Sequence, residues 1–406
     1  MNSWNHRPAA SLLAELLLGD EPRARAAAQA AQDRGSWMTL IRTSRAWRIL
    51  PPLAERVRHF GVDLPEQESR LLRESLHEAA AQSTLVAHTA ANLLASLAAV
   101  GIDAVPFKGV ALIAGLYGNP ARRMISDVDV LVLERDIEAV EELLVARGVR
   151  PLLYQSVQEY RADRLGARSN NYAMPFRDED GVEVDLHWCL SERSNCTQFT
   201  QLLLADAVDA RLMGNKIRIP SPADAMLLTV HHVVRSDMSV ASLLKDLRDV
   251  LCWWILRPGS WELADLLDRA RSLDIETAML ACLEVLTNFN GHARLAEDTV
   301  FLRSSLTAEQ CRLASEITAL MLYRIEIGRI NPDLVAVYQR GALKRWIRAR
   351  ILRPRWVAEH EGPKAAGSVR RLLRLVSGSV RQRGFERAGY RALATVRERL
   401  MGEKAD

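Results

Sequence analysis

The sequence is poor in cysteine and in aromatic residues. Five cysteines occur in 406 residues, an odd number, and none of their spacings matches a zinc knuckle or a redox motif. A disulfide framework is therefore not expected, and each cysteine is predicted to be a small buried side chain in a reducing compartment. Aromatic residues make up only 6%, while Ala, Leu and Arg are abundant, which favours helices over an all-β fold.

The sequence also lacks a secretory signal and a convincing membrane span. Residues 1–10 show no apolar segment behind basic residues. Residues 84–102 contain no Asp, Glu, Lys or Arg over 19 positions, a length that can span a bilayer. That stretch includes His88, Asn92 and several hydroxyl side chains. We therefore expect a buried helix there, no transmembrane segment, and a cytoplasmic protein.

Negative charge is scarce near the C-terminus. Residues 340–406 contain 18 Lys and Arg against 6 Asp and Glu, a balance of +12, whereas the other 339 residues contain 36 against 44, a balance of −8. A basic segment of this kind binds nucleic acid, an anionic membrane surface or an acidic partner. The alternative is a solvated, Arg-rich helical surface. Salt-dependent nucleic-acid binding that is lost on deleting the segment would separate the two.

Local patterns divide the chain into four regions. Residues 1–100 read as helices, residues 101–220 as an α+β core, residues 221–330 as a helical domain and residues 331–406 as a basic helical tail. Strands are predicted from short apolar or alternating runs, and helices from a period of 3.6. The strands are expected at 102–107, 127–133, 171–177, 182–187 and within 205–219. The fold class is therefore α+β, with a small mixed sheet flanked by N-terminal helices and a C-terminal helical bundle.

Acidic residues of the core fall at strand spacing. Asp127 and Asp129 begin the run DVDVLVL, so both carboxylates lie on one face of the predicted strand. Because unpaired buried carboxylates are costly, a divalent cation such as Mg²⁺ or Mn²⁺ is expected between them. Glu183, Asp185 and His187 share one face of a second predicted strand. Asp185 is the predicted third ligand if that strand is adjacent, and Glu183 takes its place if the pairing is offset by two.

Three carboxylates on neighbouring strands suit a two-metal phosphoryl-transfer site. Lys108 and Gly109 lie between a predicted strand and a helix start, where backbone N–H groups and the lysine charge can meet a triphosphate. The hydroxyl of Ser126 can donate to a phosphate oxygen. Arg123 either binds a phosphate with two parallel hydrogen bonds or forms an ion pair with one of the first two aspartates, and Arg122 is the competing candidate for the phosphate.

The helical domain offers further candidates near the acceptor. His231 and His232 are adjacent in sequence and cannot share one helix face, so only one is expected near the site, and His231 is selected. Lys245 and Asp249 are spaced i, i+4. They form either an intrahelical salt bridge or a pair in which Lys245 meets phosphate and Asp249 aids the acceptor. His187 is expected near the site or packed beside its neighbouring tryptophan.

Taken as a set, these motifs resemble a family of largely uncharacterised bacterial nucleotidyltransferases. The family is part of the superfamily that includes DNA polymerase β and the aminoglycoside nucleotidyltransferases. The resemblance covers about residues 75–260. It is carried by Lys108-Gly109, Tyr117, Arg123, Asp127, Asp129, Asp185-Leu-His187-Trp188, His231 or His232, and Asp249. The sequence differs from the superfamily in one respect, because Lys-Gly replaces the Gly-Ser turn whose serine touches a phosphate.

The resemblance implies an enzyme that moves a nucleoside monophosphate from ATP, CTP, GTP or UTP to an acceptor hydroxyl and releases pyrophosphate. The acceptor would be a small molecule or a peptide or protein side chain. The implied metal ligands are Asp127, Asp129 and Asp185, and Asp129 or Asp185 can act as the general base. The alternative is a catalytically degenerate protein of the same fold that binds a nucleotide or a partner.

Overall fold

The computed structural model describes residues 9–152, 157–160, 173–190, 196–235, 239–256, 261–273 and 275–327. Most of these residues form one compact unit that ends at Ile330. The predicted basic helical tail, residues 331–406, lies outside the described residues, as do its expected contacts with an anionic partner.

The described residues before the first strand are almost entirely helical, as the sequence predicts. They form α1 (Ala9–Leu18), α2 (Glu21–Asp33), α3 (Trp37–Ala46), α4 (Leu50–His59) and the long α5 (Glu66–Ala99). Two prolines, Pro51 and Pro52, lie in the first turn of α4, where the missing N–H groups have no intrahelical partner to lose. The helix α5 ends just before Gly101, which has a φ of 76° and terminates the helix as a left-handed residue.

A five-stranded mixed sheet forms the centre of the core. Its strands are β1 (Ala104–Pro106), β2 (Asp127–Val132), β3 (Arg150–Pro151), β4 (Ala173–Arg177) and β5 (Glu183–His187), in the spatial order β1-β2-β5-β4-β3. Strands β2 and β5 run parallel, and the other neighbours are antiparallel. The predicted hairpin is confirmed as β4 and β5, whose connection contains Gly181 at a φ of 82°. The α+β class is likewise confirmed.

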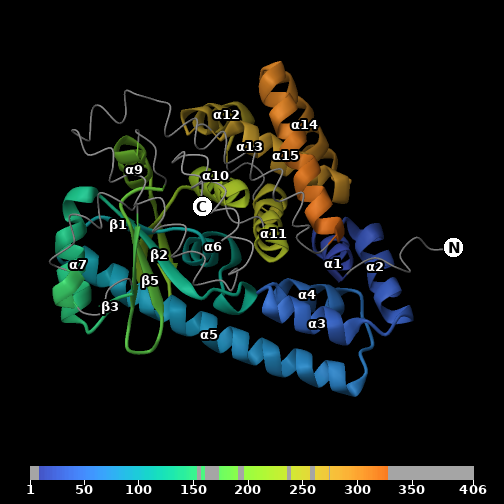
Figure 1. Cartoon of the computed structure of the whole chain (residues 1–406), viewed down its shortest axis with the longest axis horizontal. Coiled ribbons are helices and arrows are strands. Elements are labelled where there is room, and N and C mark those ends of the chain that lie inside the picture. Colours follow the sequence, from blue (N-terminus) through green and yellow to red (C-terminus); the bar gives the residue numbers. More distant parts are fainter. Residues whose placement is uncertain are drawn as a thin grey trace, which may run out of the picture. The chain divides into compact units, whose positions relative to one another are not determined.

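The alternation of β2 separates a core face from a polar face. Val128, Val130 and Val132 are fully buried in one cluster with the C-terminal half of α5. The opposite face carries Asp127 and Asp129. Figure 1 shows α5 in blue running beneath the sheet and on under α3 and α4. The acidic face is thus left open toward the helices that follow the sheet in sequence.

Further helices and a second hairpin complete the described structure. The remaining elements are α6 (Gly109–Leu112) with a π-helical turn (Ile113–Tyr117), α7 (Ile137–Ala146), α9 (Cys196–Ala205), β6 (Val208–Leu212), β7 (Asn215–Ile219), α10 (Pro222–Arg235), α11 (Val240–Leu256), α12 (Leu263–Ser272), α13 (Glu276–Phe289), α14 (Ala293–Ser305) and α15 (Ala308–Ile327). Strand is found within 205–219 as expected. Helices α10 to α15 fall in the region 221–330 that the sequence predicts to be helical.

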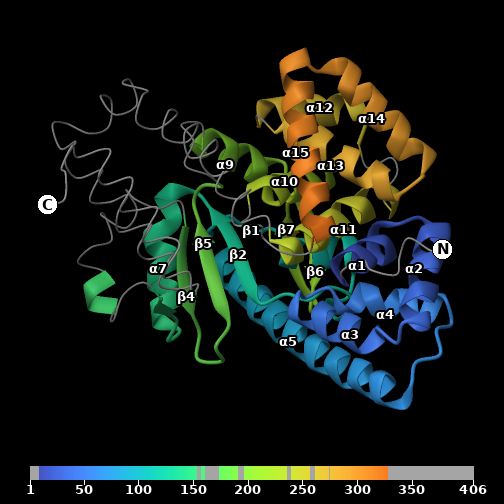
Figure 2. The same ribbon diagram turned by 45° about the vertical axis from the view of Figure 1, so that its right-hand side comes forward.

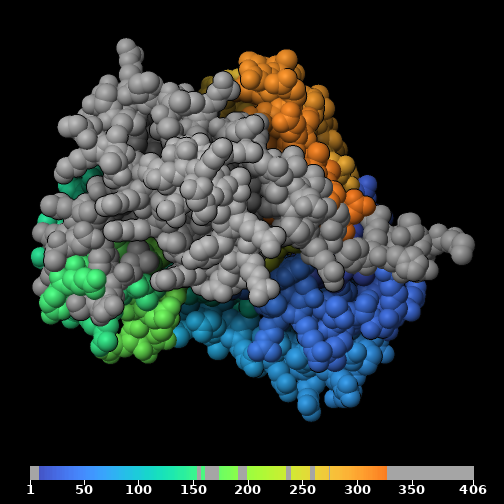
Figure 3. All heavy atoms as spheres, viewed as in Figure 1, coloured from blue at the N-terminus to red at the C-terminus, as the bar shows by residue number. Residues whose placement is uncertain are grey.

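The N-terminal helices share their core with the helices after the sheet. One hydrophobic cluster contains buried residues of α1, α3, α4, α10, α11, α13 and α15. Figure 2 shows α1 beside α11, and Figure 3 shows the N-terminal helices in blue below α14 and α15 in orange. Helices from the two ends of the described chain therefore pack as one body. The boundaries expected at residues 100, 220 and 330 stay predictions.

The cysteines only partly follow the prediction. Cys252 and Cys282 are buried free thiols, and Cys311 is a partly exposed one. The expectation is wrong for Cys189, which takes part in a disulfide bond. In the part of the chain that the structure describes, no helix combines the length and the apolar character needed to cross a bilayer.

Candidate metal and nucleotide site

The register of the sheet places Asp185 directly beside Asp129. In the parallel pair of β2 and β5, Asp129 is paired with Asp185, Asp127 with Glu183 and Leu131 with His187. Glu183 instead forms an exposed ion pair with a neighbouring arginine, so the alternative with Glu183 as third ligand is not what the register favours. Side chains paired across two strands lie close together on the same face. The three predicted carboxylates therefore lie at one edge of the acidic face.

Donor atoms of Asp129, Asp185 and His187 lie within 4.8 Å of one another. Asp129 is 3% exposed and His187 5% exposed. The Nε2 atom of His187 lies 3.1 Å from Oδ1 of Asp129, so this histidine can either join a metal or orient the aspartate. Asp127 is not a member of this close group. It accepts a hydrogen bond of 3.1 Å from the hydroxyl of Ser126.

Lys108 lies against the acidic group in a backbone conformation that side chains rarely adopt. Its φ of 52° and ψ of −127° belong to a region that glycine normally occupies. Its ammonium donates to Oδ1 of Asp129 at 2.6 Å. Strain of this kind costs about 1–3 kcal/mol and is concentrated at functional sites. The chain thus places a cation beside the acidic group in a conformation that glycine normally adopts.

The charges of the site push the two neighbouring aspartates in opposite directions. Burial raises the pKa of Asp129, but the Lys108 ammonium and His187 outweigh this effect and hold the pKa well below its usual range. Burial, together with the negative charge of Asp129, raises the pKa of Asp185 to about 6. Asp185 therefore experiences a surplus of negative charge that Lys108 alone does not neutralise.

Gly109 and Ser126 line the same polar hollow. A Cβ atom on Gly109 would lie 2.5 Å from Cγ2 of Ile125, so only glycine fits against that strand end. The hydroxyl of Ser126 donates to Asp127 and accepts a hydrogen bond from Arg48. Ser126 is therefore placed at the hollow as predicted, with its hydrogen-bonding capacity shared between an acid and an arginine.

Arg123 has a partner that neither sequence interpretation foresaw. Its guanidinium is buried and donates to both carboxylate oxygens of Asp249, from Nε at 3.0 Å to Oδ1 and from Nη2 at 2.7 Å to Oδ2. Its Nη1 donates to the carbonyl of Met124 at 2.6 Å, and Tyr117 donates to Asp249 at 2.6 Å. Burial lowers the pKa of Arg123, but Asp249 raises it more, so the arginine stays charged. This pair ties the sheet domain to α11.

The hollow beside the carboxylates has a volume of about 100 Å³ and is lined from both the core and the helices. Its polar lining comprises Arg48, Lys108, Arg123, Ser126, Asp127, Asp129, Thr229, His232, Lys245 and Asp246. On α10 the structure brings His232, rather than the selected His231, to this lining. Lys245 reaches the hollow as predicted, but its nearest carboxylate is Asp246, at 3.9 Å, and not Asp249.

Three polar residues of the hollow, Arg48, Thr229 and Asp246, were not predicted from the sequence. Nδ1 of His232 lies 2.7 Å from Asp246. Burial raises the pKa of Asp246, but the bond to His232 outweighs burial, so the pKa of Asp246 lies below its usual range. Asp246 stands next to Lys245 in the charged run KDLRD of α11, a sequence signal that could have identified it. Arg48, at a φ of 59°, and Thr229 carried no such signal.

The comparisons with known proteins agree with this geometry. The chain matches the family described as uncharacterised nucleotidyltransferase over residues 33–291, more than half its length, and the match includes every residue of the hollow. No curated protein matches the chain.

Two solved structures resemble parts of the chain. One is the solution structure of the antibiotic-resistance factor ANT(2'')-Ia, with 14% identity, a TM-score of 0.33, and coverage of 48% of this chain and 96% of that one. The other is an antigenic nucleotidyltransferase-like protein from Paracoccidioides brasiliensis, with 19% identity, a TM-score of 0.29, and coverage of 48% and 91%. TM-scores this low establish no shared architecture. The long family match does decide the family, and the chain belongs to the uncharacterised nucleotidyltransferases.

Proposed function

We propose that the protein transfers a nucleoside monophosphate from an NTP to an acceptor hydroxyl and releases pyrophosphate, with Mg²⁺ or Mn²⁺ as the metal. The observation that carries the proposal is the pairing of Asp129 with Asp185 across parallel strands, in a chain of nucleotidyltransferase family. Family membership alone implies nucleotidyl transfer in general. The metal, the donor nucleotide and the acceptor are part of the present proposal.

The donor set suits a divalent cation. Three carboxylates face one ammonium, that of Lys108. Burial lowers the pKa of Lys108, but the three carboxylates raise it more. A divalent cation offsets the remaining negative charge, and carboxylate oxygens are the ligands that Mg²⁺ and Mn²⁺ prefer. Asp127, Asp129 and Asp185 would hold it, with His187 orienting Asp129. When bound, the metal supplies charge stabilisation for the phosphates and the leaving pyrophosphate.

Asp185 is the better of the two candidate proton acceptors. In the metal-free protein its pKa is about 6, which is the higher of the two and the closer to neutral pH, where a general base is most effective. The pKa of Asp129 is held too low for that task by Lys108 and His187. We assign the acceptor hydroxyl proton to a carboxylate oxygen of Asp185, and a fixed, charged role to Asp129.

The residues proposed to bind the nucleotide surround the same hollow. Lys108 and Lys245 supply positive charge to the triphosphate, and Gly109 allows its close approach. Ser126 donates a hydroxyl hydrogen bond when it turns from Asp127. Arg123 is assigned a positioning role, because its donors are occupied by Asp249 and Met124.

The alternative remains a protein of this fold that binds a metal and nucleotide without turnover. The specific observation in its favour is the ion pair between Lys108 and Asp129, in which an ammonium occupies an oxygen needed by a metal. A cytoplasmic location, binding of ATP in particular, and a role of the basic tail in holding an anionic partner are proposals from the sequence alone.

The test is transfer of label from each of the four NTPs, labelled at the α-phosphate, in the presence of Mg²⁺ or Mn²⁺. Pyrophosphate release and labelled product are expected with the wild type, and neither with Asp129→Ala. Glu183→Gln is the matched control, because Glu183 lies on the neighbouring strand β5 and is paired to the exposed Arg177. Metal and nucleotide binding without turnover would favour the alternative, and absence of both kinds of binding would refute the proposal.

A further inference from the structure

A second pocket adjoins the hollow and is lined by a surplus of positive charge. It is formed where α4 and the turn before it meet α11 and the segment 117–124, and it contains none of the carboxylates of β2 and β5. Its charged lining consists of Arg48, Arg122, Arg123, Lys245 and Arg248 against Glu55 and Asp249. The pocket shares Arg48, Arg123, Met124 and Lys245 with the hollow, so the two are neighbouring compartments of one site.

Part of this positive charge is already neutralised, and part is not. Arg123 is paired with Asp249, and Arg122 with Glu55 at 3.0 Å. Arg248 makes one hydrogen bond within the described residues, from Nη1 to the carbonyl of Leu17 at 3.2 Å.

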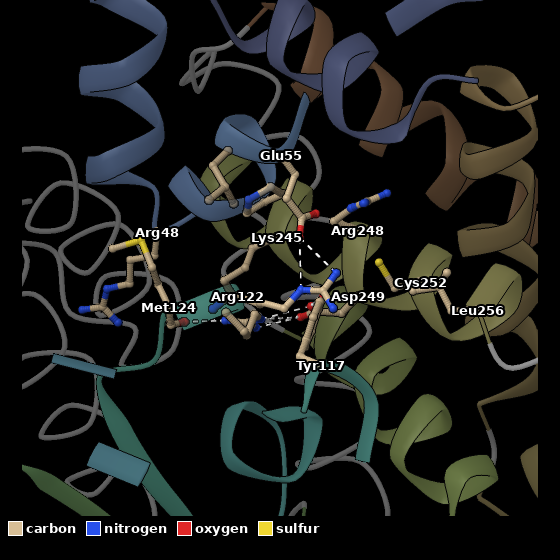
Figure 4. Close-up of a pocket in the computed structure, with 13 residues that line it drawn as sticks. Arg48, Glu55, Tyr117, Arg122, Met124, Lys245, Arg248, Asp249, Cys252 and Leu256 are labelled. Carbon is tan, nitrogen blue, oxygen red and sulfur yellow. Dashed lines mark hydrogen bonds and ion pairs between the residues drawn. The ribbon is translucent and has the colours of Figure 1, made fainter. Parts of the chain in front are cut away.

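Arg48 and Lys245, the other two basic side chains, also have no close carboxylate partner among the described residues. Arg48 is bonded to the hydroxyl of Ser126 rather than to an acid, and Lys245 comes no closer than 3.9 Å to Asp246. In the view of Figure 4, Arg48 and Arg248 lie to either side of Lys245. Among the described residues, these three basic side chains therefore lack a close carboxylate partner while they face the same space.

Helical periodicity explains why α11 contributes so many of these groups. Lys245, Arg248, Asp249 and Cys252 recur at spacings of three and four, which places them on one face of the helix. Ile49 and Pro52 give the pocket an apolar wall on the side of α4. Partly buried cations without partners are unfavourable, so a polar and charged face of this kind suits a ligand with negative charge.

We propose that this basic pocket holds the anionic group of the acceptor, so that the acceptor is a hydroxyl compound bearing a phosphate or carboxylate. The inference rests on the proposed nucleotidyl transfer. The cavity of about 30 Å³ has room for about two water molecules, which matches the oxygens of one small anionic group. A polycationic acceptor would be repelled by the surplus charge of the pocket.

The same chemistry could come from the triphosphate of the NTP, but the layout favours the acceptor. The triphosphate must lie beside the metal ligands, and the hollow that contains Asp127 and Asp129 has its own cations in Lys108 and Lys245. The basic pocket is the next compartment, beyond Lys245. An acceptor anchored there by its anionic group would extend its hydroxyl into the hollow, which shares Arg48 and Lys245 with the pocket.

The experiment is calorimetric titration of inorganic phosphate into the full chain saturated with Mg²⁺ and a non-hydrolysable ATP analogue. One phosphate site is expected, weakened about tenfold in Arg248→Met because charge-assisted hydrogen bonds are lost. Glu55→Gln should strengthen it by about threefold, because it releases Arg122. Arg42→Met is the matched control, since Arg42 is exposed on α3 and does not line the pocket.

The outcomes separate the two proposals. Phosphate that binds the free protein but is excluded by the analogue would assign the pocket to the triphosphate and overturn the inference. Absence of phosphate binding, or binding that none of the lining variants changes, would overturn it as well. Failure of the analogue itself to bind in the presence of Mg²⁺ would instead count against the proposed nucleotidyl transfer.

Discussion

Two clusters of buried charge lie along the same hollow and differ in their balance. Asp129 and Asp185 face each other on neighbouring strands, with Lys108 as their one ammonium, and the pKa of Asp185 is raised to about 6. Arg123 and Asp249 are matched one to one, with two side-chain donors of the arginine on the carboxylate. The first cluster is short of positive charge, whereas the second is complete without any ligand.

The difference separates a site from a structural contact. A cluster that holds charges of one sign together at a cost to the folded state is typical of a functional site. A buried ion pair with all its hydrogen bonds made is typical of a structural contact, and the fold is strongly destabilised when one partner is removed. Variants of the two clusters should therefore fail in different assays, activity for the first and stability for the second.

The largest expected effect is on turnover. Asp129→Asn should lower nucleotidyl transfer by about 10³-fold or more, because the metal contributes several kcal/mol to the transition state. Its melting temperature should fall as well, because the lowered pKa of Asp129 means that its charge stabilises the folded state, so activity is compared at a temperature at which both proteins are folded. Release of pyrophosphate and thermal denaturation measure the two properties. A variant that kept its activity would show that Asp129 is not a metal ligand.

The second largest effect is on stability. Asp249→Ala should destabilise the fold by about 3–5 kcal/mol, since it leaves the Arg123 guanidinium buried without its partner. Urea denaturation measures the loss. Glu183→Gln breaks an exposed ion pair and should cost less than about 1 kcal/mol. The double variant Arg123→Met with Asp249→Leu should recover much of the stability. If it does not, the loss in Asp249→Ala is not explained by an unpaired buried charge alone.

The third effect depends on pH. The pKa of Asp185 rises from 3.8 to about 6 in the folded protein, so the folded state binds the proton more tightly and loses stability as pH rises through 6. Metal-free Asp185→Asn should therefore be more stable than the wild type by up to about 3 kcal/mol at pH 8. The difference should shrink toward zero by pH 4.

Denaturation in EDTA at the two pH values measures this difference, and added Mn²⁺ should reverse its sign by stabilising only the wild type. Equal stabilities at pH 8 would mean that burial and Asp129 do not raise the pKa of Asp185.

The smallest effect concerns the backbone of Lys108. Lys108→Gly and Lys108→Ala both remove the ammonium, but only glycine fits the φ of 52° without strain. The glycine variant should exceed the alanine variant in stability by about 1 kcal/mol. Thermal denaturation of the pair measures the difference. Identical stabilities would argue against strain at this position.

The strands and their acidic face could be predicted because their signals are local. The alternation in DVDVLVL from Asp127 fixes which side chains share a face, and the turn at Gly181 fixes the hairpin. The spacing of Asp185 within its strand then leaves two registers, and the one observed pairs it with Asp129. Short-range geometry was enough for the strands and their faces, whereas the adjacency of β2 and β5 was a condition that only the structure met.

The partners of the helical residues could not be predicted in the same way. Arg123 and Asp249 lie 126 positions apart, and no local pattern says which helix face meets the sheet. The choice between His231 and His232 depends on a rotation of α10 that only packing decides. The positive φ of Lys108 also has no signature, because lysine rarely takes a conformation that suits glycine. Long-range packing therefore determined what sequence patterns left open.

The most direct test of the central claim is a crystal structure of the full chain with Mn²⁺ and a non-hydrolysable NTP, measured at the manganese absorption edge. The account predicts an anomalous peak within bonding distance of the carboxylates of Asp129 and Asp185, with the Lys108 ammonium moved from Asp129 toward the phosphates. A bound nucleotide with no manganese at these carboxylates, and Lys108 still bonded to Asp129, would contradict it.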